Sequence, residues 1–373
     1  MTRRVKLLLT SVGGLAGHNI LDVLEYPGFS RRSLVRVVGT NSTPDAACNF
    51  RCDRCYLVPV TATAEYPARM REILLEESPD LILCCRDEDT LALSQLKNQH
   101  PELPGALPVV EPRAALIGLD KWQTWLFTRK HSLAYAESFM PGQSGDGAAL
   151  EAFCRRVGYP LIAKPTHGAA SRGVCFIRDT HDAQAVAERP GYMFQEYVGD
   201  PGSLEPYFAI LHGPPPLFAH FAKAGYHVCH TVISRSGDIT PIAVTENHVH
   251  YGHTTLNRRI LDPLLDALTV DYARALFLEG VAGPMAIQIR RDRDGDWKVL
   301  EINLRATGGT LARFIRGIDE LYFIIKAFVD TSFPELHPYR IDGCEQVVKQ
   351  FYSYPVFDSD VLVLNRSGVW SRS

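Results

Sequence analysis

The chain has 373 residues, 46% of them hydrophobic and 22% charged, and a formal net charge of −3 at pH 7. Such a chain can bury more than one hydrophobic core, so we expect two or three subdomains. This charge provides no basic surface for nucleic acid or for an anionic membrane, which leaves small molecules as the expected partners. Nine cysteines, an odd number, favour a reduced cytoplasmic protein over a disulfide framework.

Strand and helix patterns alternate along the N-terminal part of the chain. The predicted strands are the apolar runs Val5–Thr10, Val35–Thr40 and Leu81–Cys85. The predicted helices are His18–Glu25, Tyr66–Glu77 and Glu88–Asn98. This alternation predicts an open parallel sheet. Lys6 interrupts the first apolar run, so we expect no signal peptide, and no window approaches the roughly 18 apolar residues of a membrane span.

A glycine turn, SVGGLAG at 11–17, follows the first predicted strand. A dinucleotide fingerprint needs G-x-G-x-x-G and an acidic residue at the end of the second strand. Here Val12 stands at the first glycine position, and Thr40 and Asn41 end that strand. We therefore favour a tight turn that lets a helix pack on the sheet over a nicotinamide site.

Three cysteines, Cys48, Cys52 and Cys55, have the C-x₃-C-x₂-C spacing of radical S-adenosylmethionine enzymes, in which three thiolates hold a [4Fe–4S] cluster. The spacing alone matches well. The trio follows the second strand of an open α/β unit, however, and nothing downstream repeats as a (β/α) barrel would. Packing cysteines are the favoured interpretation, and the iron–sulfur enzyme is kept as an alternative.

Two lysines are candidates for binding phosphate. Lys121 lies at the start of a predicted helix with Asp120 as its N-cap, and Lys164 ends the predicted strand of YPLIAKP. The small residues of THGAASRG at 166–173 follow Lys164 and would let backbone amides approach phosphate closely. Lys164 is the stronger candidate, with a plain hairpin loop as the alternative.

The strand YMFQEYVG at 192–199 has apolar sides and a polar middle. Such an edge can offer backbone groups, an amide or a carboxylate to an adenine while apolar residues cover the ring. Glu205 follows closely enough to reach a ribose hydroxyl.

Two strands, Met285–Arg291 and Trp297–Asn303, are predicted to form a hairpin around the turn Asp292–Asp296. Alternation of side chains lets Gln288, Glu301 and Asn303 converge on one face. These oxygen ligands suit Mg²⁺ carried by a nucleotide phosphate, with Arg305 as a nearby fixed cation. The alternative is an ordinary surface hairpin.

Together these segments resemble the ATP-grasp superfamily, and within it the carboxylate–amine ligases similar to the large subunit of carbamoyl phosphate synthetase. The resemblance runs from about residue 5 to about residue 330, and its motifs occur in the family's order. The matching motifs are SVGGLAG, LDK at 119–121, PLIAKP at 160–165, HGAASRGV, FQEYVG at 194–199 and GPMAIQIR…VLEINLRATGG at 283–309.

The resemblance implies a role for each candidate residue. Phosphate contacts fall to Lys121, Lys164 and the loop residues Ser171 and Gly173. Nucleoside contacts fall to Gln195, Glu196 and Val198 for adenine and to Glu205 for ribose. The magnesium ligands are Gln288, Glu301 and Asn303, and the catalytic residues are Arg305 and Lys164. Many relatives carry a carboxylate at the position of Gln288, which bears on whether one or two metal ions bind.

The implied fold is α/β, an ATP-grasp fold with an N-terminal open parallel α/β (pre-ATP-grasp) domain. The expected division is an N-terminal domain at 1–111, a small lobe with the glycine-rich loop at 112–200, a large lobe with the Mg²⁺ site at 201–335, and a C-terminal extension at 336–373 that packs on the large lobe.

The implied activity is an ATP-dependent, ADP-forming ligation of a carboxylate and an amine through an acyl phosphate. The cofactors would be ATP and Mg²⁺, with Mn²⁺ as a substitute, and the partners a small carboxylate and a small amine. We expect a cytoplasmic protein that binds neither nucleic acid nor membrane, and a homodimer is compatible with this scheme. A nucleotide-binding protein without turnover is the second alternative.

The acceptor site is less well defined by the sequence. Arginines and a polar turn are candidates for holding a carboxylate, because Arg forks match carboxylates; they are Arg235, Arg258, Arg313 and Thr307–Thr310. Histidines cluster between 227 and 253, at His227, His230, His248, His250 and His253, but their spacing does not form a closed zinc set, so loop histidines are favoured.

Overall fold

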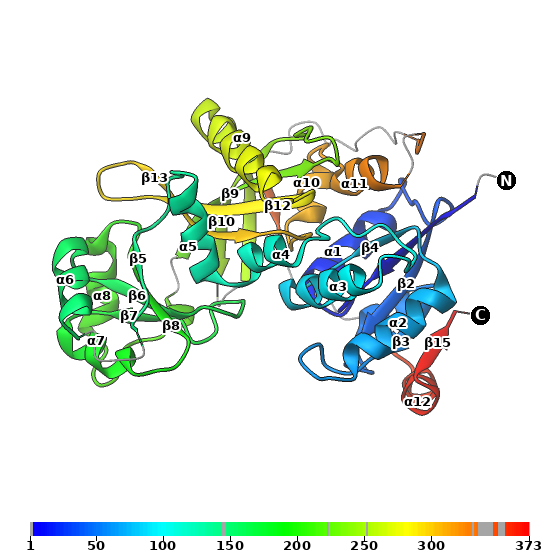
Figure 1. Ribbon diagram of the computed structural model, residues 1–373, viewed down its shortest axis with the longest axis horizontal. Helices are drawn as coiled ribbons and strands as arrows, with labels where there is room; N and C mark the ends of the chain where they lie inside the picture. The colour runs from blue at the N-terminus through cyan, green and yellow to red at the C-terminus, as the bar shows by residue number, and fades with distance from the viewer. Residues whose placement is uncertain are drawn as a thin grey trace.

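Three β-sheets with their flanking helices make up the computed structural model (Figure 1). The structure describes residues 3–142, 147–221, 224–250, 253–329, 332–334, 346–349 and 355–372. A small-lobe sheet lies at one end of the long axis, a large-lobe sheet in the middle and the N-terminal sheet at the other end. No helix in these ranges has the length and apolar character needed to cross a bilayer.

The N-terminal sheet has the strand order β15-β3-β2-β1-β4. Its parallel strands are β1 (Val5–Leu9), β2 (Val35–Asn41), β3 (Arg54–Leu57) and β4 (Leu81–Leu83). Its helices are α1 (Leu15–Leu24), the 3₁₀ helix η1 (Ala47–Arg51), α2 (Tyr66–Glu77) and α3 (Asp87–Gln99). The predicted parallel α/β domain is therefore correct.

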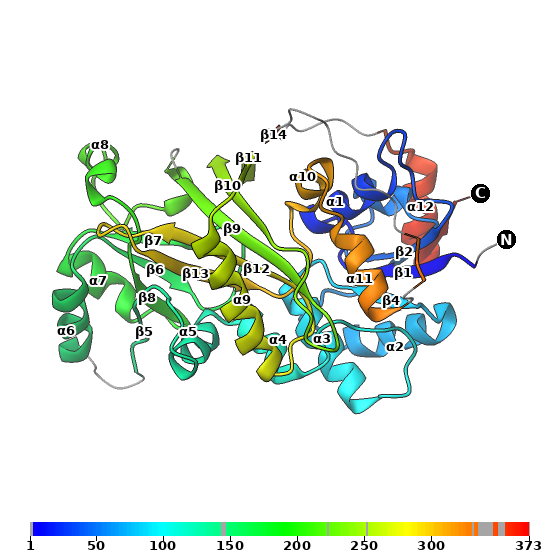
Figure 2. The same cartoon turned by 90° about the horizontal axis from the view of Figure 1, so that it is seen from above.

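Both faces of the N-terminal sheet are covered, which explains the unbroken apolar runs of its strands. In β1 the side chains of Leu7 and Leu9 enter the core shared with α1, whereas Leu8 enters the core shared with α2 and α3. The first of these cores also takes up Leu321 and Ile325 of α11 (Glu320–Phe328), which lies with α10 (Thr310–Ile315) between the N-terminal and large-lobe sheets (Figure 2).

The small-lobe sheet is antiparallel, with the order β5-β8-β6-β7. Its strands are β5 (Ser138–Phe139), β6 (Leu161–Pro165), β7 (Cys175–Ile177) and β8 (Tyr192–Glu196). Its helices are α6 (Gly147–Val157), α7 (Thr180–Ala187) and α8 (Glu205–Ala209), with the 3₁₀ turns η2 (Pro201–Leu204) and η3 (Phe218–His220). One face packs on α6 and α7, and the other faces the large lobe.

The large-lobe sheet has the order β13-β12-β9-β10-β11-β14 and is antiparallel. Its strands are β9 (Ala224–Ile233), β10 (Ala243–His250), β11 (His253–Ile260), β12 (Gly283–Arg291), β13 (Trp297–Asn303) and β14 (Gln346–Val348). The helices packed on its outer face are α4 (Pro112–Leu119), α5 (Lys121–Lys130) and α9 (Pro263–Leu278). The predicted hairpin at 285–303 is confirmed, and β12 begins two residues earlier than predicted.

The lobe boundaries at residues 111, 200 and 335 stay predictions, and two segments bear on them. Helices α4 and α5 were assigned to the small lobe, but Ile117 and Phe127 share a core with Met285 of the large lobe.

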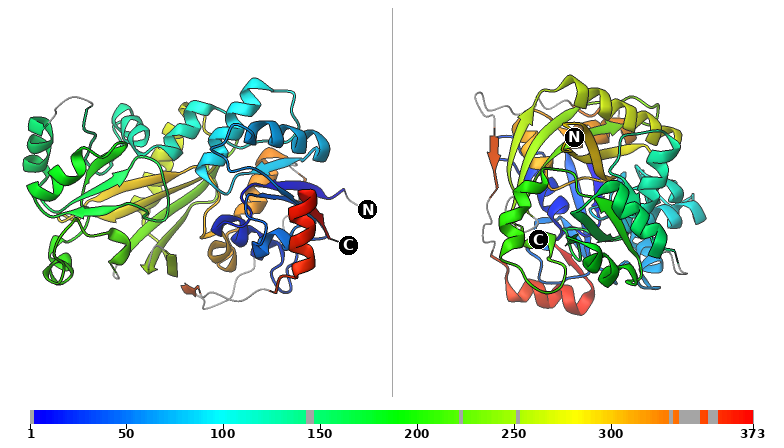
Figure 3. Two further views of the ribbon diagram at one scale, coloured as in Figure 1. Left: turned by 90° about the horizontal axis from the view of Figure 1, so that it is seen from below. Right: turned by 90° about the vertical axis from the view of Figure 1, so that its left-hand side faces the viewer.

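The C-terminal extension divides in two. Strand β14 joins the large-lobe sheet, but β15 (Val369–Ser371) pairs with β3, and α12 (Asp358–Ser367) lies beside it against the N-terminal domain (Figure 3). The expectation that all of 336–373 packs on the large lobe is wrong for this last part. Residues 335–345 and 350–354 lie outside the described ranges.

Candidate active site

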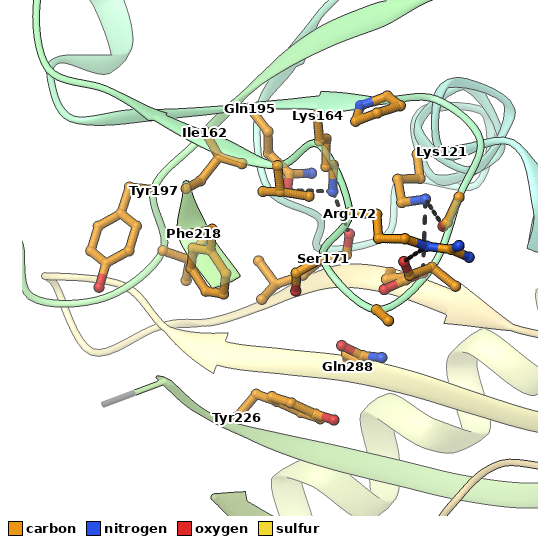
Figure 4. Close-up of a pocket in the computed structure, with 18 of the residues that line it drawn as sticks. Lys121, Ile162, Lys164, Ser171, Arg172, Gln195, Tyr197, Phe218, Tyr226 and Gln288 are labelled. Carbon is orange, nitrogen blue, oxygen red and sulfur yellow. Dashed lines mark hydrogen bonds and ion pairs between the residues drawn. The ribbon is translucent and has the colours of Figure 1, made fainter. Parts of the chain in front are cut away.

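A cavity of about 230 Å³ lies between the small-lobe and large-lobe sheets. One wall is built from strands β6 and β8, residues 197–198 after β8, and the loop 167–172. The other wall is built from β9, β12 and β13 (Figure 4). Charged and amide groups line one end and apolar side chains the other. A cavity with this division suits a ligand that has an anionic end and an apolar end.

Lys164 is the last residue but one of strand β6, and its side chain lines the charged end of the cavity. Its Nζ donates hydrogen bonds to Gln195 Oε1 at 2.8 Å and to the Leu300 carbonyl at 3.2 Å. Burial, together with the charge of Lys121, lowers the pKa of Lys164 to about 7, against the attraction of Glu301. The charge is thus held by neutral oxygens, and a bound anion would stabilise it.

Lys121 is the first residue of α5 and also lines the cavity. Asp120 caps the helix by accepting hydrogen bonds from the backbone of Trp122 and Gln123, at 2.8 and 3.2 Å. The Lys121 Nζ donates to the Gly168 carbonyl at 2.9 Å and lies 3.9 Å from Glu301 Oε1. The two lysines predicted from separate motifs therefore meet in one cavity.

The loop 167–173 bends back into this cavity. Gly168 and Gly173 have φ values of 128° and 73°, and a Cβ on Gly173 would lie 2.8 Å from the Tyr192 hydroxyl. Ala170 and Ser171 are also left-handed, each at φ 55°, a conformation that costs a non-glycine residue of order 1–3 kcal/mol. Ser171 lines the cavity, whereas Gly173 shapes the loop behind it.

The apolar end of the cavity is lined by side chains from both lobes, namely Ile162, Val174, Val198, Phe218, Tyr226 and Val249. Val198 is where the sequence predicted a nucleoside contact. Gln195 and Glu196 also line the cavity, but their side chains already have protein partners. Gln195 bonds Lys164 and the Ser138 hydroxyl, and Glu196 forms an ion pair with Lys298 at 2.8 Å.

Glu205, predicted to reach a ribose, is exposed at the start of α8 and does not line the cavity. The longer segment Asp200–Leu204 forms the 3₁₀ turn η2, which carries Glu205 outward. The structure gives this residue no place at the cavity.

The hairpin supplies the floor of the charged end. Gln288 and Glu301 are direct partners in the β12–β13 ladder and both line the cavity. Asn303, two residues beyond Glu301, is buried outside the lining, and its Oδ1 accepts a hydrogen bond from Arg305 Nη2 at 2.9 Å. Gln288 and Glu301 therefore lie side by side across the ladder, and Asn303 lies two residues further along β13.

Sequence reasoning missed the partner of Arg305. Asp87, the first residue of α3 in the N-terminal domain, accepts a hydrogen bond from Arg305 Nε at 2.8 Å and forms an ion pair with Arg305 Nη2 at 2.8 Å. Burial raises the pKa of Asp87, against the attraction of Arg305. The cluster of acidic residues at 87–89 was the only signal for this residue in the sequence.

The donor set fits Mg²⁺ through the chemistry of its atoms. Glu301 contributes a carboxylate, and Gln288 and Asn303 contribute amide oxygens, ligand types that Mg²⁺ accepts beside phosphate and water. Only one of the three carries a charge, so much of the charge balance for a divalent cation would come from a bound phosphate.

The cysteine trio is part of a core. Cys52 and Cys55 are fully buried, and Cys48 is nearly so. A Cβ built on Gly39 would lie 2.6 Å from Cys52 Sγ and 3.5 Å from Cys55 Sγ, so the backbone of β2 fills the space beside these two sulfurs. Burial raises the pKa of Cys48 to about 11, which disfavours the thiolate that an iron cluster needs.

The other candidates do not assemble into a single acceptor site. Arg313 is buried in an ion pair with Glu320, Arg258 is exposed beside Glu246, and Arg235 lies over the Phe328 ring. Within the described ranges, His227, His230 and His248 do not belong to a group of three potential metal ligands. The side chains of His250 and His253 lie outside the described residues.

Comparison with known proteins identifies chains with the same fold. No family model matches the chain. The multifunctional protein pyrABCN of Emericella nidulans is 23% identical over 200 residues, which cover 51% of this chain and 8% of that protein. The chain therefore matches only a small part of that protein's length.

Solved structures agree over most of the chain. N5-carboxyaminoimidazole synthetase of Staphylococcus aureus, complexed with ADP, has a TM-score of 0.65 at 13% identity and covers 88% of this chain and 78% of its own. The L-amino acid ligase of Bacillus licheniformis has a TM-score of 0.59 at 14% identity, over 91% of this chain and 78% of its own.

The biotin carboxylase domain of Hydrogenobacter thermophilus 2-oxoglutarate carboxylase has a TM-score of 0.62 at 12% identity, over 90% of this chain and 71% of its own. Identities this low establish a shared fold. The chain has the ATP-grasp fold, preceded by an open parallel α/β domain, and the predicted fold class is confirmed.

Proposed function

We propose that the chain is an ATP-dependent ligase that joins a small carboxylate to an amine through an acyl phosphate and releases ADP and phosphate. The observation that carries the proposal is the meeting of Lys121 and Lys164 in one cavity, above the Gln288–Glu301 pair of the hairpin. The solved structures with the same fold include proteins named as ligases, synthetases or synthases, and three of these were determined with ADP.

In this proposal the apolar end of the cavity holds the adenine, and backbone groups near Val198 meet its polar edge. Lys121 and Lys164 contact phosphate oxygens, and the Gly168 carbonyl that Lys121 now binds gives way to the nucleotide. The loop 167–173 covers the phosphates and excludes water.

In phosphoryl transfer the protein contributes little covalent chemistry and acts mainly by stabilising charge. Arg305, held by Asp87 and Asn303, presents its guanidinium beyond the end of β13, where the phosphoryl group passes to the carboxylate. When bound to Glu301, Gln288 and Asn303, Mg²⁺ would neutralise phosphate charge. Mn²⁺ would serve in its place.

The partners we propose are a small carboxylate and a small amine, with no nucleic acid and no membrane. One structural neighbour is described as a domain dimer, which supports testing this chain as a homodimer. The nine cysteines, eight of which are free and buried in the described residues, support our proposal of a cytoplasmic location.

Two measurements test the proposal. A panel of carboxylates and amines is assayed for ADP release, and the reactive carboxylate is then labelled with oxygen-18. Label in inorganic phosphate is expected, because the acyl phosphate carries one carboxylate oxygen away. Release of AMP that carries one labelled oxygen, with pyrophosphate in place of phosphate, would mean an adenylate intermediate. ATP binding without turnover across the panel would favour a nucleotide-binding protein.

A further inference from the structure

Arg290 faces the same cavity as the proposed phosphate and metal residues. It lies two positions beyond Gln288 on β12, and both side chains line the cavity. Its Nε donates a hydrogen bond to the Gly225 carbonyl at 2.6 Å. Its guanidinium carbon lies 5.7 Å from the centre of the Phe218 ring. Sequence reasoning attached no role to this residue.

The charge of Arg290 has no carboxylate partner among the residues that the structure describes. Three other arginines that are buried or partly buried do have one: Arg31 pairs with Asp319, Arg305 with Asp87 and Arg313 with Glu320. Arg290 is half-buried. A partly buried cation without a counter-charge is unfavourable unless another electron-rich group meets it.

The position of Arg290 identifies which part of a nucleotide would meet it. The lysines that we propose to bind phosphate lie at the charged end, whereas the Arg290 guanidinium lies beside the Phe218 ring at the apolar end. Figure 4 shows Ile162 on the small-lobe side of this space and Tyr226 on the large-lobe strands below it. A flat ring entering here has the small-lobe sheet on one face and the β12 strand on the other.

We propose that Arg290 is a base-binding residue whose planar guanidinium stacks on the face of the nucleotide base. Guanidinium groups stack on aromatic faces, and the contact strengthens when water is excluded. The inference rests on the proposed nucleotide site and adds a specific element of base recognition to it. Arg290 then contributes to nucleotide affinity through the base and not through the phosphates.

The test compares two neighbouring arginines and two probes. Arg290→Leu removes the cation and keeps an apolar floor. Arg291→Leu is the matched control, because Arg291 is exposed and stacks instead on Trp297, at 4.1 Å, outside the cavity. The dissociation constants of ATP and of inorganic tripolyphosphate, each with magnesium, are measured by calorimetry. We expect Arg290→Leu to raise the Kd of ATP by about tenfold and to leave that of tripolyphosphate unchanged, with Arg291→Leu like wild type for both.

Arg290→Lys keeps the positive charge but loses the planar guanidinium, so ATP affinity should fall less than in Arg290→Leu. This variant also serves if circular dichroism shows that Arg290→Leu is unfolded. Unchanged ATP affinity in both variants would overturn the inference, and so would equal weakening of ATP and tripolyphosphate, which would place Arg290 on the phosphates. If wild-type protein binds tripolyphosphate but not ATP, the proposed base-binding site is wrong. If it binds neither, the proposed ATP-dependent function is wrong as well.

Discussion

The surroundings of Lys164 disfavour the charged form of its side chain. Its pKa is lowered to about 7 by burial and by Lys121, so in the free protein the uncharged form grows as the pH rises above 7. A nucleotide phosphate favours the charged form, so binding should take up a proton and the Kd of ATP should rise with pH between about pH 7 and about pH 9. Calorimetry in buffers of different ionisation enthalpy measures this proton uptake.

Replacing Lys164 by Met keeps the stem and removes the charge. ATP affinity or turnover should fall by about two orders of magnitude, because a charge-assisted phosphate contact is worth ~3 kcal/mol. The pH dependence of binding should also disappear. Lys130→Met, at an exposed lysine that pairs with Glu279, is the control and should match wild type. Wild-type kinetics in Lys164→Met would remove this residue from the phosphate site.

Glu301 is the one carboxylate in the proposed metal set. Glu301→Gln keeps the shape of the side chain and loses the charge, so turnover should fall far more than ATP affinity, because charge develops in the transition state. A magnesium titration of the rate should show a higher half-saturating concentration. Equal losses in ATP affinity and turnover, with an unchanged magnesium requirement, would contradict the assignment.

Local patterns predicted which residues reach the cavity better than they predicted what each side chain does there. Lys164 at a strand end and Glu301 in a hairpin follow from spacing alone, because alternation decides which face a strand residue occupies. The contacts of Gln195 and Glu196 did not follow. Their partners, Lys164 and Lys298, come from other strands, and side-chain pairing across strands is not encoded in the spacing of one of them.

At the scale of elements, the strands and helices near the site were predictable because their signals are local. Asp120 caps α5 as predicted, and the β12–β13 hairpin surrounds the expected turn. Strand β15 was not predictable, since its three residues gain strand structure only by pairing with β3, more than three hundred positions earlier in the chain.

The segment from β2 to β3 carries the cysteine trio, and its packing leads to a prediction. Replacing Cys48, Cys52 and Cys55 together by Ala should leave ATP turnover largely intact, because the trio packs in the N-terminal core and not at the cavity. Stability should drop by about 2–4 kcal/mol, since three buried sulfurs are lost. Ala is preferred to Ser here because a hydroxyl in this core would add an unpaired polar group.

Thermal unfolding and an ATP turnover assay compare the triple variant with wild type. Iron analysis of protein purified without oxygen is the decisive control for the radical-enzyme alternative. Stoichiometric iron with a charge-transfer absorption band, lost in the triple variant, would show that the trio holds a cluster.

At the scale of the whole molecule, the site is built where separately packed parts meet. The N-terminal sheet shares a core with α11, and the outer face of the large-lobe sheet shares another with α4, α5 and α9. The cavity lies on the opposite face of the large-lobe sheet, against the small lobe. Sequence patterns report which face of an element is apolar but not which distant element covers it, so this arrangement required the structure.

The contact between Asp87 and Arg305 joins the N-terminal domain to the proposed phosphoryl site across 218 positions of sequence. Because Asp87 fixes the Arg305 guanidinium from outside the cavity, Asp87→Asn should lower turnover by about tenfold, equivalent to ~1.4 kcal/mol, with little change in ATP affinity. Glu88→Gln, next to Asp87 and paired with exposed Arg86, is the control and should retain wild-type turnover.

A double-mutant cycle shows whether Asp87 acts through Arg305. Arg305→Lys keeps a positive charge and loses the fork that binds both Asp87 and Asn303, so turnover should fall in this variant as well. Once the fork is gone, Asp87→Asn should cost little more, because residues in contact couple by about 0.5–3 kcal/mol. The turnover numbers of wild type, the two single variants and the double variant measure this coupling. If the fold-loss of turnover in the double variant equals the product of the two single-variant losses, Asp87 acts independently of Arg305. The N-terminal domain would then support the site by some other contact.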